Sequence, residues 1–206
     1  MRVVIGPDAL LGRGRRVNAG VQHWEDWFAA GDGFLRPGAG EMSLLTRHLP
    51  PAAGARALDV GCGLGGYAAE LAQVGYTTLA VDWAVSSVAA VRDRYEGLEP
   101  NLEARQVDFE DAKAVAELPR DSFDVVTMRL VYAFMNDRPA VAGRVRRLLR
   151  PGGVWVVTTP LANRLPADRA HIALAGQDIG GLLAGWDSGA WYDLEPGGLR
   201  CFILQK

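Results

Sequence analysis

"ALDVGCGLGGYAAELA", residues 57–72, decides the fold of this chain. An apolar run that predicts a buried strand is followed by four glycines within six residues, and then by an alanine- and leucine-rich helix. A strand, a glycine-rich turn and a helix in this order are typical of nucleotide binding, because the turn lets the backbone approach the ligand closely. The rest of the sequence must indicate which nucleotide is held.

Short β-branched runs alternate with amphipathic segments after residue 55, a pattern that indicates an α/β fold with a parallel sheet. The predicted strands are 56–60, 77–82, 102–108, 123–128 and 154–159, and the predicted helices between them are 66–74, 86–95, 111–117 and 138–150. Beyond them we expect a loop over 160–176, a helix over 177–184 and a hairpin over 190–206 that turns at 196–198.

The N-terminal quarter has a different pattern, with helices predicted at 21–29 and 41–48 over the edge of the sheet. We expect one domain over 1–206, in which 1–54 form a helical cap or lid and 55–206 form the core with a C-terminal β-hairpin. The basic segment 12–16, "GRGRR", is either a flexible leader or a phosphate contact.

Composition narrows the possible partners. The net charge of −2 argues against nucleic acid as a partner, because nucleic-acid-binding domains are normally basic. No apolar run approaches the roughly 18 residues of a membrane span, and no signal-peptide core is apparent. Two cysteines and three histidines without metal-ligand spacing predict no metal site. We expect a cytoplasmic protein that acts on a small molecule.

The glycine turn fits the pattern Gly61-x-Gly63-x-x-Gly66, and Asp82 follows about 20 residues later at a predicted strand end. This arrangement suits NAD and S-adenosylmethionine equally, since a carboxylate there binds ribose hydroxyls. Asp59 separates them, because it would face the diphosphate of NAD with like charge. S-adenosylmethionine instead presents an ammonium and a sulfonium there, so we expect S-adenosylmethionine. The alternative role of Asp59 is to cap the glycine turn.

Asp108 ends the third predicted strand, in "VDFED". Ligands of open α/β sheets bind at the carboxyl ends of the strands, so Asp59, Asp82 and Asp108 are expected around one crevice. Asp108 can accept a hydrogen bond from the adenine amino group, and Phe109 can lie against the ring. The alternative is that Asp108 caps the next helix, a role for which Asp111 competes.

Residues 56–159 resemble a class I S-adenosylmethionine-dependent methyltransferase through "ALDVGCGLGGYAAELA", "AVDWA", "VDFED", "FDVVTM" and "LLRPGGVWVVTTP". The resemblance implies a Rossmann-like α/β fold with a seven-stranded, mostly parallel sheet in the order 3-2-1-4-5-7-6 and strand 7 antiparallel. It also implies S-adenosyl-L-methionine as cofactor, with its carboxylate at the helix N-terminus after the glycines. The cofactor-binding residues predicted in the core are Asp59, Gly61, Cys62, Gly63, Asp82, Trp83, Asp108, Phe109 and Arg129; a purely steric role is the alternative for Cys62.

Residues 23–49 resemble, more loosely, the N-terminal segment of the thiopurine and tellurite-resistance methyltransferases, in which a tryptophan-rich helix closes over the cofactor. Here Trp24 and Trp27 are the expected cofactor contacts, and Gly31, Gly33 and Gly38 form a mobile connection. The alternative is that these aromatic side chains are the core of a static helical cap.

The acceptor is expected to meet the loop after the fourth strand, "MRLVYAFMND" (128–137). This loop lacks the Asn/Asp-Pro-Pro-aromatic motif of enzymes that methylate amino groups of nucleic-acid bases. Arg129 either orients an anionic acceptor or pairs with Asp124, Asp137 or an acidic strand end. Tyr132 and His23 are further catalytic candidates, each with packing as the alternative.

We therefore expect methyl transfer by direct displacement to an oxygen, nitrogen or sulfur atom of a small molecule. The alternatives are non-methylating chemistry with the same cofactor, such as cyclisation, a binding module without turnover, and a NAD-dependent oxidoreductase.

Overall fold

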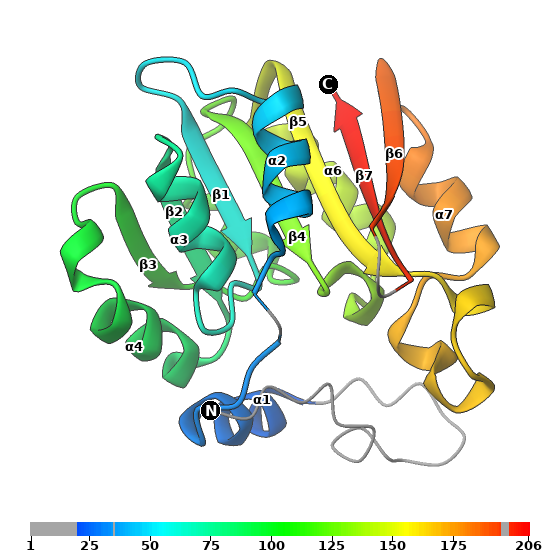
Figure 1. Ribbon diagram of the computed structural model, residues 1–206, viewed down its shortest axis with the longest axis horizontal. Coiled ribbons are helices and arrows are strands. Elements are labelled where there is room, and N and C mark those ends of the chain that lie inside the picture. Colours follow the sequence, from blue (N-terminus) through cyan, green and yellow to red (C-terminus); the bar gives the residue numbers. More distant parts are fainter. Residues whose placement is uncertain (1–19, 35, 195–197) are drawn as a thin grey trace.

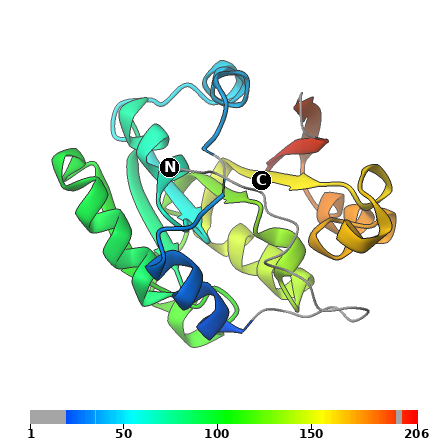
Figure 2. The same cartoon turned by 60° about the horizontal axis from the view of Figure 1, so that its bottom comes forward.

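The computed structural model describes residues 20–34, 36–194 and 198–206. Its seven-stranded sheet has the order β3-β2-β1-β4-β5-β7-β6, and helices cover both faces (Figures 1 and 2). β3, β2, β1, β4 and β5 are parallel, whereas β7 is antiparallel to both of its neighbours, β5 and β6. The predicted fold class and strand order are therefore confirmed. The basic segment 12–16 lies outside the described residues.

The strands are β1 Arg56–Val60, β2 Thr77–Asp82, β3 Leu102–Gln106, β4 Phe123–Arg129, β5 Leu149–Pro160, β6 Ser188–Leu194 and β7 Leu199–Gln205. The helices are α1 Val21–Ala29, α2 Ala39–His48, α3 Gly66–Gln73, α4 Val85–Arg94, α5 Ala112–Ala116, α6 Arg138–Leu148 and α7 Gly176–Leu183. The short 3₁₀ helices are η2 Glu96–Leu98, η3 Tyr132–Phe134, η4 Ala162–Arg164 and η5 Ala167–Ile172.

The turn between β1 and α3 is built from left-handed backbone. Gly61, Gly63 and Gly65 have φ angles of +68°, +50° and +79°, and Gly65 is the N-cap residue of α3. Glycine adopts these angles without steric cost, whereas other residues rarely do. Gly75, with φ of +114°, follows the last turn of the helix. The glycines thus set both ends of α3, which places its N-terminus at the carboxyl edge of the sheet.

Several element boundaries differ from the prediction, and three of these differences have a reason in the structure. β3 ends at Gln106 rather than at 108, although the amide of Val107 still bonds to the carbonyl of Asp82. β5 begins at Leu149, because Leu149 pairs with Phe123 and the glycines of "PGG" bond to the last residue, Lys206. The predicted loop 160–176 contains η4 and η5, and Leu161 and Leu174 form a parallel bridge and are both buried. These pairings are distant in sequence, so local patterns do not show them.

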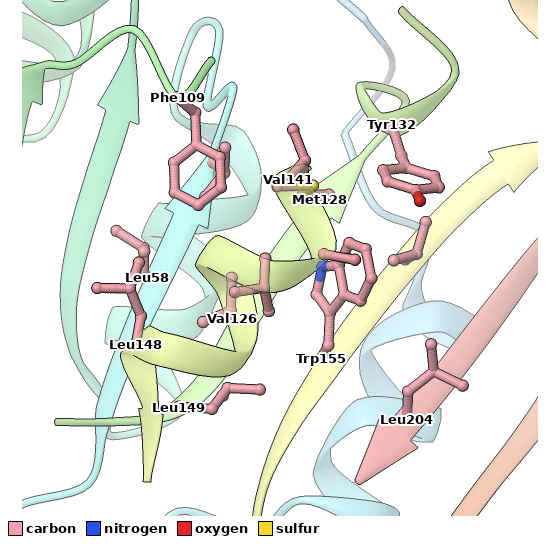
Figure 3. Close-up of a cluster of buried hydrophobic side chains, with 14 of the residues drawn as sticks. Leu58, Phe109, Val126, Met128, Tyr132, Val141, Leu148, Leu149, Trp155 and Leu204 are labelled. Carbon is pink, nitrogen blue, oxygen red and sulfur yellow. The ribbon is translucent and has the colours of Figure 1, made fainter. Parts of the chain in front are cut away.

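The largest hydrophobic cluster lies between the sheet and α6 (Figure 3). Trp155 of β5 is fully buried at its centre, and the ring of Tyr132 packs edge-on against it with 5.1 Å between ring centroids. A second cluster, which includes Leu45, Tyr67 and Leu71, fills the space under α2 and α3 on the opposite face. The two clusters fix the sheet on both sides, so the carboxyl edge of its strands is a rigid platform.

A glycine-to-alanine pair tests the turn. Gly61→Ala is expected to lower the free energy of unfolding by about 1–3 kcal/mol, because a Cβ at this positive φ would lie 2.5 Å from a methyl of Val131. Gly143→Ala, inside α6, is expected to raise it by roughly 0.5–1 kcal/mol, because no described atom beyond its chain neighbours and the adjacent helix backbone lies within 4 Å of the added Cβ. Denaturant unfolding of both variants measures the difference, and equal stabilities would contradict this account of the turn.

Candidate functional site

Asp82, the last residue of β2, connects the two turns at the carboxyl edge. Its Oδ2 accepts a hydrogen bond from the amide of Gly63 at 2.9 Å, and its Oδ1 accepts one from the amide of Ala84 at 3.0 Å. Burial raises the pKa of this carboxyl, and the two amide bonds oppose that rise. Each carboxylate oxygen has a second lone pair. Asp82 can therefore hold the glycine turn and still accept hydroxyl donors.

Asp59, in β1, is the second buried carboxylate, with 2% of its surface exposed. Its Oδ1 accepts a hydrogen bond from the Thr127 hydroxyl at 2.7 Å, whereas its Oδ2 is buried without a hydrogen-bond partner among the described residues. Burial raises the pKa of Asp59 to about 7, and the nearby charge of Asp82 adds to this, while Thr127, Arg129 and the backbone of Ala68 oppose it. A buried, unsatisfied anionic oxygen is complementary to a cationic group. The hydrogen bond to Thr127 and the backbone contribution of Ala68 connect Asp59 to β4 and to the first turn of α3.

The space beside the glycines is filled by the chain's own side chains. A Cβ at Gly61 would lie 2.5 Å from Val131, and one at Gly63 would lie 3.2 Å from the ring of Phe28. Val131 follows β4, and Phe28 belongs to α1. A ligand bound against this turn would therefore also contact the loop after β4 and helix α1, which cover the site.

Helix α1 lies across the carboxyl edge of the sheet (Figures 1 and 2). Its buried residues Trp24 and Phe28 stack with 5.8 Å between ring centroids, and Trp24 meets Phe134 edge-on at 5.6 Å. Leu64 and Trp83 are half-buried against the same cluster. The helix thus contacts the loops that follow β1, β2 and β4, as expected of a cap over the cofactor crevice.

His23 and Trp27 lie on the same helix. The ring of His23 packs against Trp24 and Trp27, with centroid distances of 5.3 and 6.2 Å. His23 Nε2 and Trp27 Nε1 are both buried and without hydrogen-bond partners among the described residues. The structure therefore places His23 in an aromatic packing group, which agrees with the alternative to a catalytic role.

The structure places the neighbouring residues Asp108 and Phe109 in different environments. Asp108 is exposed, and its Oδ1 accepts a hydrogen bond from the amide of Glu110 at 2.8 Å. Asp111 caps α5, so the helix cap is not the role of Asp108. Phe109 is only 4% exposed and belongs to the core cluster of Figure 3, rather than lying open for a nucleobase. In this position the ring of Phe109 is not open for the predicted stacking on adenine.

Cys62 and Trp83 were also predicted at this site. The Cys62 thiol is buried 3.7 Å from the Ser87 hydroxyl, and burial raises its pKa well above the usual range. The Cys62 side chain is thus neutral and fills space, which agrees with the purely steric role given above as its alternative. Trp83 is half-buried beside α1, and its carbonyl accepts a hydrogen bond from Gln106.

Arg129, at the end of β4, pairs with a residue that the sequence analysis missed. Its Nε lies 3.1 and 3.0 Å from the two carboxylate oxygens of Glu41 in α2. Glu41 also accepts a hydrogen bond from the Thr158 hydroxyl at 2.9 Å, and the ion pair is buried. The available signal was the position of Glu41 four residues before Leu45, on the face of α2 that packs against the sheet.

The predicted partners of Arg129 have other roles. Asp124 accepts a hydrogen bond from the amide of Arg56 and pairs with Arg150, and Asp137 caps α6. The expectation that either of them pairs with Arg129 is therefore wrong.

Tyr132 lies in the hydrophobic core. It is 2% exposed and packs on Trp155 (Figure 3). Its hydroxyl lies 3.5 Å from the carbonyl of Arg138. Burial raises the pKa of Tyr132 to about 12. This position agrees with the packing alternative for Tyr132.

Metal-binding and membrane-spanning features are both absent from the described residues. In this part of the chain, no group of three or more His, Cys, Asp or Glu side chains is arranged to hold a metal ion. No helix within it is long and apolar enough to cross a membrane.

Comparison with known proteins agrees with this geometry. Residues 58–157 match the family described as "Methyltransferase domain". The chain is 35% identical over 133 residues to a ubiquinone biosynthesis O-methyltransferase of Xanthomonas oryzae pv. oryzae (strain PXO99A), covering 64% of this chain and 53% of the relative. It is 39% identical over 136 residues to nocamycin O-methyltransferase of Saccharothrix syringae, covering 65% and 46%. The chain thus spans about half the length of these curated relatives.

Among solved structures, an S-adenosylmethionine-dependent methyltransferase from Mesorhizobium loti superposes with a TM-score of 0.67 at 19% identity, over 82% of this chain and 99% of that one. The fold is therefore that of the class I S-adenosylmethionine-dependent methyltransferases, and the family match to residues 58–157 agrees with that fold. These findings do not show the looser similarity of residues 23–49 to thiopurine and tellurite-resistance methyltransferases.

The unsatisfied oxygen of Asp59 gives a stability prediction. A carboxyl whose pKa rises on folding stabilises the fold fully below its unfolded-state pKa of about 3.9, and this contribution is lost as the pH rises through 7, at about 1.4 kcal/mol per pKa unit. Asparagine carries no charge to bury. Asp59→Asn is therefore expected to melt at a higher temperature than the unmodified chain at pH 8, with the difference shrinking towards pH 5.

Asp193→Asn is the control, because ion pairs with Arg200 and Arg164 hold the pKa of Asp193 below its usual range. It is expected to lower the melting temperature at pH 8. If Asp59→Asn destabilised the protein equally at pH 5 and pH 8, the carboxylate would not be the unfavourable group described here.

Proposed function

We propose that this protein binds S-adenosyl-L-methionine and transfers its methyl group to a small molecule. The observation that carries the proposal is the buried, unsatisfied Oδ2 of Asp59 beside a glycine turn and a second carboxylate, Asp82. Two buried carboxylates side by side are unfavourable without a cation. A ligand with an ammonium and a sulfonium relieves that cost, and a diphosphate increases it.

In this proposal, each of three carboxylates contacts a different part of the cofactor. Asp59 faces its ammonium group, Asp82 accepts from its ribose hydroxyls, and Asp108 has a carboxylate oxygen for the adenine amino group. The N-terminus of α3, capped by Gly65 in a left-handed conformation, offers amides to its carboxylate. Trp24 lies over this crevice and limits the entry of water.

Bound S-adenosylmethionine supplies an activated methyl group, so the protein has to align the acceptor and keep water away. The buried Arg129–Glu41 pair fixes the end of β4, where the acceptor approaches. The relatives named above are O-methyltransferases, which favours an oxygen acceptor on a small molecule, with nitrogen and sulfur as the other choices.

Cofactor binding is the first test. Calorimetry is expected to detect S-adenosylmethionine and S-adenosylhomocysteine but not NAD. Because the pKa of Asp59 is about 7 in the free protein and a bound ammonium lowers it, binding should release protons near pH 6. Affinity should then fall as the pH drops from 8 to 6, by up to about tenfold per pH unit below the pKa.

Asp59→Asn serves as the matched control, since it keeps the size of the side chain and removes the charge. It is expected to weaken cofactor binding and to abolish this pH dependence. NAD affinity equal to that of S-adenosylmethionine would reject the proposal. Mass spectrometry of methylated products separates methyl transfer from a non-methylating use of the same cofactor.

Asp82→Asn is expected to weaken S-adenosylhomocysteine binding, because one hydrogen-bond acceptor to the ribose becomes a donor; a lost charge-assisted bond costs about 1.5–3 kcal/mol. The loss of the Gly63 or Ala84 bond should also lower the melting temperature. Unchanged affinity in a folded variant would show that the carboxylate serves the turns alone.

A further inference from the structure

Glu25 of α1 reaches across to the first turn of α4. Its Oε1 accepts a hydrogen bond from the amide of Val85 at 2.6 Å, and its Oε2 accepts one from the amide of Ser86 at 2.9 Å. The Ser86 hydroxyl donates in return to the Glu25 carbonyl at 3.0 Å. Three hydrogen bonds thus join two helices that are about 60 residues apart in sequence.

Helix α4 depends on this contact for its cap. The first amides of a helix have no partner within it, and a side-chain acceptor normally satisfies them. The N-cap residue of α4 is Ala84, which has no polar side-chain atom to do so. Glu25 supplies both the acceptor oxygens and a negative charge, which the helix dipole favours at this end.

The same short stretch carries the carboxylate proposed for the ribose. Asp82 accepts from the amide of Ala84, and Glu25 accepts from the next two amides along the chain. Of three consecutive amides, the first therefore donates to Asp82 in the core, and the next two donate to Glu25 of the covering helix α1. A displacement of Glu25 leaves the amides of Val85 and Ser86 without this acceptor, next to the amide that Asp82 holds.

Among the described residues, helix α1 has few other contacts to hold it. It has nine residues, of which Trp24 and Phe28 are the buried ones, and Val21 is 44% exposed. A helix of this length is marginal on its own in water. Within the described part of the chain, its position across the carboxyl edge thus rests on one aromatic cluster and on Glu25.

We propose that Glu25 is a positioning residue that holds α1 over the cofactor crevice, so that cofactor affinity depends on Glu25 although it contacts no ligand. The dependence on cofactor rests on the proposed function; the docking of α1 does not.

The test compares Glu25→Ala with Asp26→Ala. Asp26 is the neighbouring acid, is exposed, and accepts a hydrogen bond from Gln22 of the same helix. In the ligand-free protein, Glu25→Ala is expected to raise amide hydrogen exchange over residues 21–29 at least tenfold, and to weaken S-adenosylhomocysteine binding about tenfold. Asp26→Ala is expected to leave both measurements unchanged.

A second variant separates positioning from simple capping. Glu25→Ala combined with Ala84→Ser gives α4 an acceptor of its own. The proposal expects renewed protection of residues 85–89, with α1 still exchanging fast and the affinity still low. Ala84 is fully buried in the aromatic cluster of Trp24, where an added hydroxyl has little room. If the hydroxyl does not fit, Glu25→Gln serves as the second variant. It keeps one amide oxygen as an acceptor and is expected to restore part of the affinity that Glu25→Ala loses.

Recovery of full affinity in the double variant would overturn the proposal, since Glu25 would then only cap α4. Unchanged protection of residues 21–29 in Glu25→Ala would overturn it as well. If the unmodified protein bound no S-adenosylhomocysteine, the proposed function would fail, and the ligand-free exchange would still decide whether Glu25 holds α1.

Discussion

The hydrogen bond from the Gly63 amide to the Asp82 carboxylate is the interaction on which the site depends. It joins the turn after β1 to the turn after β2, and the second oxygen of Asp82 fixes the start of α4 at Ala84. Burying a carboxylate is costly unless donors satisfy it, and backbone amides at turns are rigid donors. The relative positions of α3 and α4, and therefore the shape of the crevice between their N-termini, follow from this one side chain.

The two other buried acidic groups differ in how well they are satisfied. Glu41 meets Arg129 and Thr158, so both of its oxygens have partners. Asp59 has Thr127 on one oxygen and no partner among the described residues on the other. A fully paired ion is a structural element, whereas a half-satisfied one keeps an unfavourable free energy that a ligand can relieve. This difference, rather than acidity itself, distinguishes the proposed ligand-binding residue from the structural one.

The elements predicted best are those whose signals are local, such as α1, which has its predicted bounds of 21–29. The strand order came from the resemblance to a family. The direction of Phe109 and Tyr132 could not be predicted, since an aromatic residue after a strand can face the core or the ligand with the same sequence pattern. The position of Glu41 four residues before Leu45 indicated a shared helix face, but it did not indicate Arg129, 88 positions away, as the partner. A charged residue on an amphipathic helix looks solvent-exposed in sequence unless its face is known.

The cost of breaking the contacts of two glutamates, Glu41 and Glu25, bears on whether the N-terminal segment is a static cap or a lid. Glu41 is buried with Arg129, and separating such a pair leaves an uncompensated buried charge at a cost of about 3–5 kcal/mol. Glu25 is half-buried at a helix end, where water can replace it on the amides of Val85 and Ser86. Releasing the Glu25 contact is therefore less costly than separating Glu41 from Arg129, and opening α1 also exposes Trp24 and Phe28. Helix α2 is thus the more firmly fixed of the two helices, and α1 is the one that we propose to open for a ligand.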